Sequence, residues 1–448
     1  MNREIDILTI EVGSTITKAN GFVRAADGLL QHVAQGFAPT SIAQGDVEIG
    51  VRGALAELQH TSRRRQEGAE VFVNSSAAGG LRMTVHGLTY NMTARAAREA
   101  SLGAGAIVKL VTAGRLAASD LAEIRRLQPN IILLAGGVDF GAREVVLDNA
   151  ADLAAARLGV PVIYAGNAAL VDTVREFFAG TGSEVLVAPN VFPDVDVLNV
   201  DPLRKIIQEA FARHIIHAPG MEKLQQLTSR PVLPTPGAVL KAAEIFAEAM
   251  GDVVVLDVGG ATTDVHSVTE GSPAFADKLT DPEPRAKRTV EGDLGVFVNA
   301  RHIFDLTADA QWQARAEEVR AMPATGRERE VTRWLCARAV EAGMRRHAGT
   351  LHDLYTPSGR KQIVRGKDLT AVKWVIGTGG ALTRVEGGEA ILRAMCTGPG
   401  KFLLPQPEAK VLLDRQYLFS AMGTIADACR DEVRTLFTRW SGENGGRR

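Results

Sequence analysis

The pattern of apolar and polar positions predicts a β-hairpin at the start of the chain. Residues 5–12 form a β-branched run that is typical of a strand, and residues 17–23 predict a second one. Only a short Gly-Ser-Thr turn separates the two, so the pattern indicates a hairpin and not the strand–loop–helix of a Walker motif. Apolar residues at helical spacing then predict a helix over residues 46–60.

From about residue 70 the pattern alternates between short strands and helices. Strands are predicted at 71–74, 131–135 and 160–164, and helices at 93–102, 143–157 and 168–178. This alternation is typical of a parallel sheet covered by helices. Two of the strands end alike, in AGGVDFG and AGNAA, which hints at an internal near-repeat.

The second half of the chain begins after a proline-rich boundary near residues 231–236. Helices are predicted at 201–228, 237–250 and 309–347, and strands at 253–256 and 374–376. The run at 253–256 is continuously apolar, so we expect that strand to be buried. We therefore predict an N-terminal lobe (1–63), an inserted α/β domain (64–230), a C-terminal lobe (231–440) and a disordered tail (441–448).

Composition excludes several classes of protein. Lys plus Arg number 51 and Asp plus Glu 52, so the net charge does not indicate binding to nucleic acid or to an anionic membrane. The apolar runs are too short to span a bilayer, and we see no signal peptide. The three cysteines are far apart, so their spacing matches no metal-binding motif. Unpaired cysteines of this kind fit a reducing compartment. We expect a cytoplasmic protein without nucleic-acid or membrane partners.

The segment VVVLDVGGATTDVHSV, residues 253–268, carries the clearest chemistry. Asp257 and Asp264 suit a hydrated magnesium ion, which binds few carboxylates and keeps several waters. Between them lie glycines that let backbone amides approach a phosphate and hydroxyls that donate to it. These candidate phosphate-binding residues are Gly259, Gly260, Ala261, Thr262 and Thr263.

Two further turns have similar chemistry. The first hairpin offers the acid Glu11, a turn of Gly13, Ser14 and Thr15, and then the cation Lys18. Near the end of the chain, a strand runs into Gly377, Thr378, Gly379 and Gly380 before a helix. Such a turn suits close approach of the backbone to a nucleotide, with the helix N-terminus facing the anion.

In this order the three turns resemble the phosphate-one, phosphate-two and adenosine motifs of the actin, sugar-kinase and heat-shock chaperone ATPases. The resemblance implies an α/β, actin-like ATPase fold of duplicated ribonuclease H-like lobes with an inserted α/β domain. In that superfamily a connecting loop near the γ-phosphate corresponds to TVEGDLG (289–295), and a connecting helix to residues 420–423.

More of the chain resembles one branch, the accessory or reactivating protein of methylaspartate (glutamate) mutase, of the MutL/GlmL type and unrelated to mismatch repair. The segments are NSSAAGGLRM, LLAGGVDFGARE, YAGNAALV, APNVFP and PTPGAVL. Diol dehydratase reactivase and hydantoinase-type proteins are similar more distantly. The resemblance implies an ATP-binding, ATP-hydrolysing factor with magnesium that repairs an adenosylcobalamin-dependent mutase, and leaves a homo-oligomer open.

On this hypothesis two hairpins from two lobes hold the ATP phosphates, with Glu11, Asp257 and Asp264 organising magnesium and the attacking water. Glu291 or Asp293 is a candidate base or water-orienting group. The first motif usually begins with Asp in this superfamily, so Glu11 is a departure that weakens a claim of hydrolysis more than one of binding.

Other functions stay open at this point. A small-molecule kinase of the same fold needs an acid on a substrate hydroxyl, for which Asp139 or Asp293 is a candidate. A hydantoinase-like ATP-dependent hydrolase and a nucleotide-binding scaffold without turnover are further alternatives. His86 and His266 are expected to be plain hydrogen-bonding residues, and Asn167 a loop residue without a catalytic task.

Overall fold

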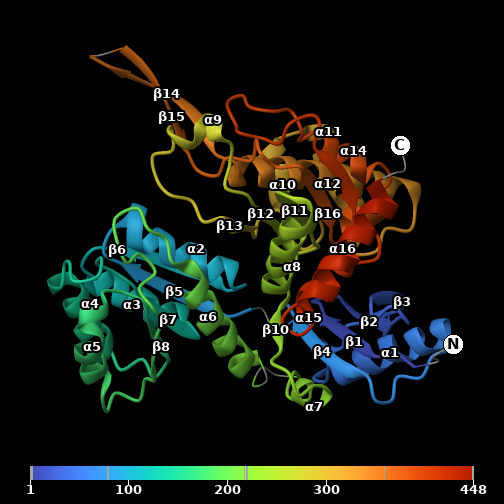
Figure 1. Ribbon diagram of the computed structural model, residues 1–448, viewed down its shortest axis with the longest axis horizontal. Coiled ribbons are helices and arrows are strands. Elements are labelled where there is room, and N and C mark those ends of the chain that lie inside the picture. Colours follow the sequence, from blue (N-terminus) through green and yellow to red (C-terminus); the bar gives the residue numbers. More distant parts are fainter. Residues whose placement is uncertain (1–3, 78–79, 216, 218–219, 358, 446–448) are drawn as a thin grey trace. The chain divides into compact units, whose positions relative to one another are not determined.

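The computed structural model describes residues 4–77, 80–215, 217, 220–357 and 359–445. The chain divides into two compact units, residues 1–21 with 34–237 and residues 22–33 with 238–448. Figure 1 labels the elements along the chain. No helix among the described residues is both long enough and apolar enough to cross a membrane.

The first sheet has the order β10-β4-β1-β2-β3. Its strands are β1 (Ile7–Val12), β2 (Ile16–Arg24), β3 (Leu30–Pro39), β4 (Glu70–Ser75) and β10 (Leu233–Pro234). Helix α1 (Glu48–Ser62) and the 3-10 turn η1 (Ile42–Gln44) connect β3 to β4. Because β4 pairs with β1 in parallel, the strand at 70–75 belongs to this sheet. Residues 70–75, which the predicted inserted domain (64–230) includes, therefore lie in the first sheet.

Between β4 and β10 the chain builds a second sheet, of order β6-β5-β7-β8-β9, in which neighbouring strands run parallel. Its strands are β5 (Arg82–Gly87), β6 (Ile107–Ala113), β7 (Ile131–Leu134), β8 (Val162–Tyr164) and β9 (Val185–Val187). The parallel sheet predicted from the strand–helix alternation is confirmed. Apolar residues of β7, β8 and the helices that follow them form one of its cores.

The helices between β5 and β9 connect the strands of this sheet, and the last two helices of the segment lead from β9 to β10 of the first sheet. They are the π-helical turn η2 (Tyr90–Ala94), α2 (Arg95–Gly103), α3 (Ala118–Leu127), α4 (Glu144–Ala155), η3 (Ala168–Leu170), α5 (Val171–Phe178), α6 (Val200–Ile215) and α7 (Leu224–Leu227). The helix predicted at 201–228 is interrupted, because α6 ends at Ile215 and α7 starts at Leu224.

Helix α8 (Thr235–Met250) leads into the sheet of the other unit, whose order is β13-β12-β11-β16-β17. The strands are β11 (Val253–Val258), β12 (Thr263–Val268), β13 (Ala286–Glu291), β16 (Trp374–Thr378) and β17 (Lys410–Leu413). This order repeats that of the first sheet, with the third, second, first, fourth and fifth strands side by side. The repeat confirms the duplicated α/β lobes that the resemblance implied.

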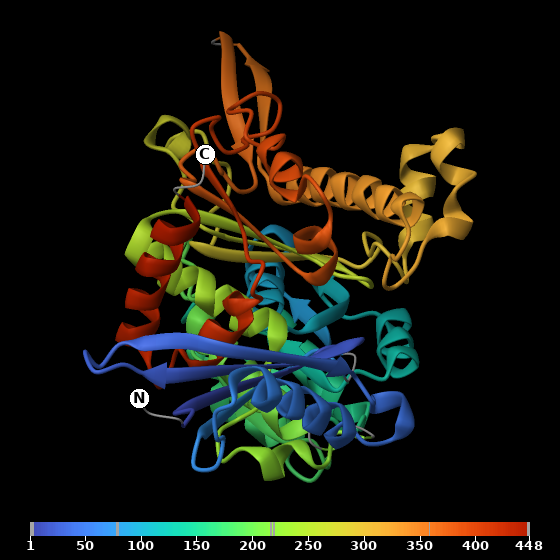
Figure 2. The ribbon, with the colours of Figure 1, turned by 90° about the vertical axis from the view of Figure 1, so that its right-hand side faces the viewer.

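Helices and a two-stranded arm complete this unit. The helices are α9 (Pro273–Ala276), α10 (Ala300–Thr307), α11 (Ala310–Gln313), η4 (Ala316–Glu318), α12 (Gly326–His347), α13 (Gly380–Arg384), α14 (Gly388–Arg393), α15 (Leu418–Ile425) and α16 (Arg430–Gly445). Strands β14 (Thr350–Thr356) and β15 (Gly359–Arg365) form a separate two-stranded sheet. Figure 2 shows this hairpin standing out from its unit.

Two sequence predictions need correction here. The helix expected at 309–347 is broken, because a capping box of Thr325 and Glu328 starts α12 afresh at Gly326. The tail expected to be disordered from 441 is helical as far as Gly445, since the buried residues Trp440 and Ser441 anchor α16 to its unit. Residues 446–448 lie outside the described residues.

Candidate functional site

The turn between β11 and β12 is the core of the candidate site. The two strands are antiparallel, and Asp257 lies opposite Asp264 in their register. The amide of Gly259 donates to the carbonyl of Thr262 at 2.9 Å, which closes the turn. The buried valines of β11 fix the start of this turn, so the two acids and the two glycines are placed by the strand and not by a mobile loop.

A second loop, residues 292–299, holds this turn from outside. The amides of Phe297 and Val298 donate to the carbonyl of Gly260 at 2.9 and 2.8 Å. The side-chain amide of Asn299 donates to the carbonyl of Ala261 at 2.7 Å. A Cβ on Gly295 would come within 2.3 Å of the Ala261 backbone, so only glycine allows this approach. The turn carbonyls are thus engaged by the loop.

The glycines of the turn leave room for a ligand. A Cβ added to Gly260 would meet only the Phe297 Cβ, at 3.5 Å, among the described atoms beyond its chain neighbours. Gly379 is different, since its φ is +88° and a Cβ there would lie 2.6 Å from the Asp257 carboxylate oxygen Oδ1. The predicted phosphate-two acid and the predicted adenosine motif are therefore adjacent within this unit.

Asp264 is engaged by an arginine that the motif did not indicate. The Asp264 Oδ1 accepts from Arg288 Nε at 2.9 Å and Nη2 at 2.6 Å. The two side chains are only 9% and 3% exposed. The other oxygen, Oδ2, accepts from the Thr262 hydroxyl at 3.2 Å. With both oxygens occupied, Asp264 is placed to orient Thr262, which weighs against the predicted role as a metal ligand.

Glu291 and Asp293 are brought together by a shared cation. Arg346 Nη1 lies 2.7 Å from Glu291 Oε2 and 2.7 Å from Asp293 Oδ1, and Nη2 lies 2.8 Å from Asp293 Oδ2. The hydrogen bond from Arg346 lowers the pKa of Asp293. A carboxylate held ionised in this way is a poor proton acceptor, so Asp293 is better suited to orient a water than to act as a general base.

Most of the predicted adenosine motif is structural. Gly377 and Thr378 belong to β16, and a Cβ on Gly377 would lie 2.8 Å from three leucine side chains. The Thr378 hydroxyl donates to the buried Asp414 carboxylate at 3.1 Å. Of the four residues only Gly380 is exposed. Any contact of this turn with a ligand is thereby limited to the backbone around Gly379 and Gly380.

The N-terminal hairpin places its polar residues as the pattern predicted. Gly13 closes the turn by donating to the Ile16 carbonyl at 3.2 Å, and Ser14 and Thr15 are exposed. The ammonium of Lys18 lies 2.7 Å from the Glu11 carboxylate. Both side chains are largely buried, so this ion pair is a fixed feature of the hairpin. Glu11 lies beside Asn74 in the register of β1 and β4.

Metal and nucleotide would be held through few protein groups. No three His, Cys, Asp or Glu side chains of the described residues come together as a metal site. Hydrated magnesium needs only one or two carboxylates, and the open glycine turn beside Asp257 fits a phosphate with its metal waters. The residues present therefore suit magnesium-bound ATP better than a metal held by protein ligands alone.

The two histidines predicted to be plain hydrogen-bonding residues, His86 and His266, are buried. The ring of His86 lies 2.8 Å from the Thr112 hydroxyl and 3.0 Å from that of Thr84, as expected for a plain hydrogen-bonding residue. His266 differs, because neither ring nitrogen has a hydrogen-bond partner among the described residues. Burial lowers the pKa of His266 well below its usual value. Both rings are therefore neutral core residues.

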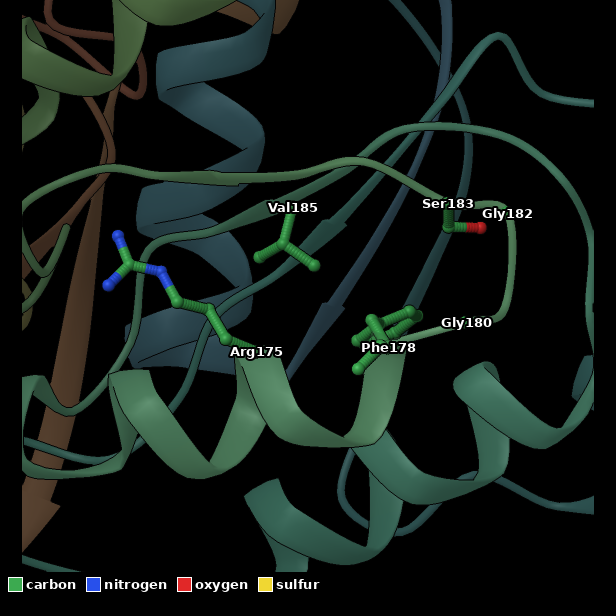
Figure 3. A pocket seen from close by; sticks show the side chains of 7 residues that line it. Arg175, Phe178, Gly180, Gly182, Ser183 and Val185 are labelled. Atoms are coloured by element: carbon green, nitrogen blue, oxygen red, sulfur yellow. The ribbon is translucent and has the colours of Figure 1, made fainter.

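A hollow of about 360 Å³ lies elsewhere, at the C-terminal end of α5 (Figure 3). It is lined by Arg175, Phe178 and Ser183 among others, and it lies at the amino end of β9. The C-terminal end of a helix carries partial negative charge, which disfavours a phosphate. This hollow does not contain any of the predicted site residues.

Comparison with known proteins identifies relatives of the chain. Residues 7–440 match the family model described as "MutL protein". "Protein MutL" of Clostridium tetanomorphum is 36% identical, over 97% of this chain and 98% of that protein. Among solved structures, nucleotide-free acetone carboxylase has a TM-score of 0.42 at 13% identity, covering 94% of this chain and 70% of that one. A nucleotide-free diol dehydratase-reactivating factor has a TM-score of 0.36 at 10% identity, covering 94% and 99%. Family membership rests on the two sequence matches, because these structural similarities are too low to support it.

Proposed function

The chain belongs to the MutL protein family, and from this premise we propose that it is an ATP-dependent accessory protein that reactivates or maintains an adenosylcobalamin-dependent mutase of the glutamate mutase type. The observation that carries the ATP-binding part is the glycine turn 259–262, held from outside and open above Gly260. The three cysteines of the chain are free and buried, which fits a reducing compartment, so a cytoplasmic location is part of the proposal.

Each group of site residues has a separate task in this proposal. The amides of Gly260 to Thr262 hold phosphate oxygens, whereas the amide of Gly259 closes that turn. In the N-terminal hairpin the amides of Ser14 and Thr15 hold phosphate oxygens and Lys18 adds positive charge, whereas the amide of Gly13 closes the turn. Asp257 in one unit and Glu11 in the other are the carboxylates that would hold waters of a magnesium ion, and such an ion would neutralise charge that develops on the phosphoryl group. Asp264 positions the Thr262 hydroxyl and is not itself a ligand.

Arg346 determines how Glu291 and Asp293 act in this proposal. It holds Glu291 and Asp293 together, so their carboxylates accept hydrogen bonds from an attacking water and fix its direction. Phosphoryl transfer depends mainly on position and charge, so no covalent nucleophile is required. Asp139, the other acid considered for a kinase, already accepts from the Ala168 amide and the Asn190 side chain, which disfavours the kinase alternative.

The test is ATP binding and hydrolysis by the pure protein with magnesium, repeated with a substrate-inactivated cobalamin mutase. We expect turnover that restores mutase activity, and an Asp257→Ala variant that folds but neither hydrolyses ATP nor rescues the mutase. Binding without turnover would indicate the scaffold alternative. Turnover that depends on a small cyclic amide would indicate the hydantoinase-like hydrolase, and transfer of phosphate to a small alcohol would indicate a kinase. Unchanged turnover in Asp257→Ala would remove that residue from the mechanism.

A further inference from the structure

The inserted sheet has a topology that creates a crevice. Counted along the chain, its five strands stand in the order second, first, third, fourth, fifth. The chain leaves β5 toward β6 on one side and reaches β7 on the other, so the loops after β5 and β7 separate. In open parallel sheets, ligands bind outside the carboxyl ends of the strands at such a switch point. The sheet therefore has one preferred place for a ligand, between β5 and β7.

Motifs that the ATP site does not use gather at this edge. AGGVDFG follows β7, AGNAA follows β8 and APNVFP follows β9, and each begins where its strand ends. A Cβ on Gly136 would lie 3.2 Å from the Leu88 amide nitrogen, so the loops after β5 and β7 approach closely at their bases. The carbonyl of Gly137 accepts from the Asn190 side chain at 3.0 Å. Three loops are thus fixed to one another.

Phe140 stands on this frame in a conformation that is unusual for its residue type. Its φ is +61°, a left-handed value that costs a bulky side chain free energy. The buried Asn167 holds it there, accepting from the Phe140 amide at 3.0 Å. The side chain is nevertheless 79% exposed, so packing does not explain the conformation. Strain held by buried side chains, with an exposed ring as its result, is typical of a functional position.

A second exposed ring follows the strand on the other side of the switch point. Tyr90 is 64% exposed and starts the π-helical turn η2, directly after the loop that ends β5. Gly87 permits this turn, because a Cβ there would lie 2.5 Å from the Ala94 nitrogen. The Thr93 hydroxyl accepts from the amides of Leu88 and Thr89, which fixes the approach to Tyr90. π-helical turns occur frequently at functional sites.

We propose that the carboxyl edge of the inserted sheet binds a small molecule with a flat conjugated ring, which packs against Phe140 and Tyr90. Aromatic side chains bind such rings by stacking, with little demand for specific hydrogen bonds. This fits a site where the amides of Asn167 and Asn190 and the carboxylate of Asp139 are already engaged by the loops. The choice of probes rests on the proposed function, which brings in two such rings, the adenine of ATP and the ring system of cobalamin.

The experiment is equilibrium dialysis of the full chain with hydroxocobalamin and, separately, with adenosine. We expect binding of at least one, weakened about tenfold by Phe140→Gly or Tyr90→Ala, the scale of losing one stacked ring. Phe177→Ala is the matched control, since Phe177 is also exposed (37%) but lies in α5, away from the loops that follow the strands. A difference in affinity between hydroxocobalamin and adenosine shows which of the two ring systems the site binds.

Phe140→Gly separates binding from folding. Glycine tolerates the left-handed conformation, so this variant should unfold at the same or a higher temperature than the original chain. Absence of binding to both probes, or equal affinity in Phe140→Gly, would overturn the proposal. Loss of mutase capture in that variant with neither probe bound would make the surface a protein interface, which also overturns it. Ring binding by a chain without ATP turnover would instead refute the proposed function alone.

Discussion

The buried ion pair beneath the phosphate-two turn makes a quantitative prediction. Arg288 donates twice to Asp264 Oδ1, and both side chains are almost fully removed from water. An Arg288→Met variant leaves the Asp264 carboxylate buried without its cation. Breaking such a pair from one side costs about 3–5 kcal/mol. We therefore expect the free energy of unfolding of this unit to fall by about that amount.

Urea denaturation followed by tryptophan fluorescence measures this directly, because all four tryptophans belong to the unit that contains the pair. Adding Asp264→Leu to Arg288→Met should recover most of the loss, since an apolar pair needs no charge compensation. Arg360→Met is the control, because the exposed Arg360–Asp353 pair at 2.8 Å should contribute less than about 1 kcal/mol. A single variant within about 1 kcal/mol of the original, or a double variant as unstable as the single one, would refute the reasoning.

Three further predictions concern the turns and a buried histidine. Gly260→Val should keep the fold but lose ATP binding, measured by calorimetric titration, because its side chain fills the space above the turn; normal affinity would exclude this turn from the site. Glu11→Asp should preserve or raise the rate of ATP hydrolysis, whereas complete loss would show that the hairpin is built around glutamate. Burial lowers the pKa of His86 from 6.5 to about 4, so its stabilising contribution is present above pH 6.5 and declines as the pH falls toward 4. At pH 5 the loss should be about 2 kcal/mol in urea unfolding, absent from His86→Gln; an equal loss in that variant would contradict the assignment.

The sequence was sufficient for features that depend on neighbouring residues. The apolar run before Asp257 and the Gly-Gly turn after it predict the β11–β12 hairpin, and the alternation from residue 70 predicts the parallel sheet. The partner of Asp264 was not predictable, because Arg288 lies 24 residues away in a strand, AKRTVE, with no apolar alternation. The same holds for Arg346, which lies in α12 and reaches Glu291 at the end of β13.

Glycines show a second limit of sequence reasoning. The pattern GTGG suggested four residues that face a nucleotide, yet Gly377 is required because Leu382, Leu392 and Leu413 fill the space beside it. A glycine that makes room for core side chains and one that makes room for a ligand look identical in a sequence. Only the distances around each Cβ position separate the two, as they do for Gly377 and Gly260.

The pairing of β4 with β10 bears on how this architecture tolerates change. Asn74 lies opposite Leu233 and Ser75 opposite Pro234, so the points where the inserted segment leaves and rejoins the first sheet are neighbours in one ladder. Adjacent strands lie about 5 Å apart. Lengthening or shortening the segment between them leaves the register of the first sheet unchanged. Homologous chains can thus diverge in size between these two strands while retaining the hairpin that begins with Glu11.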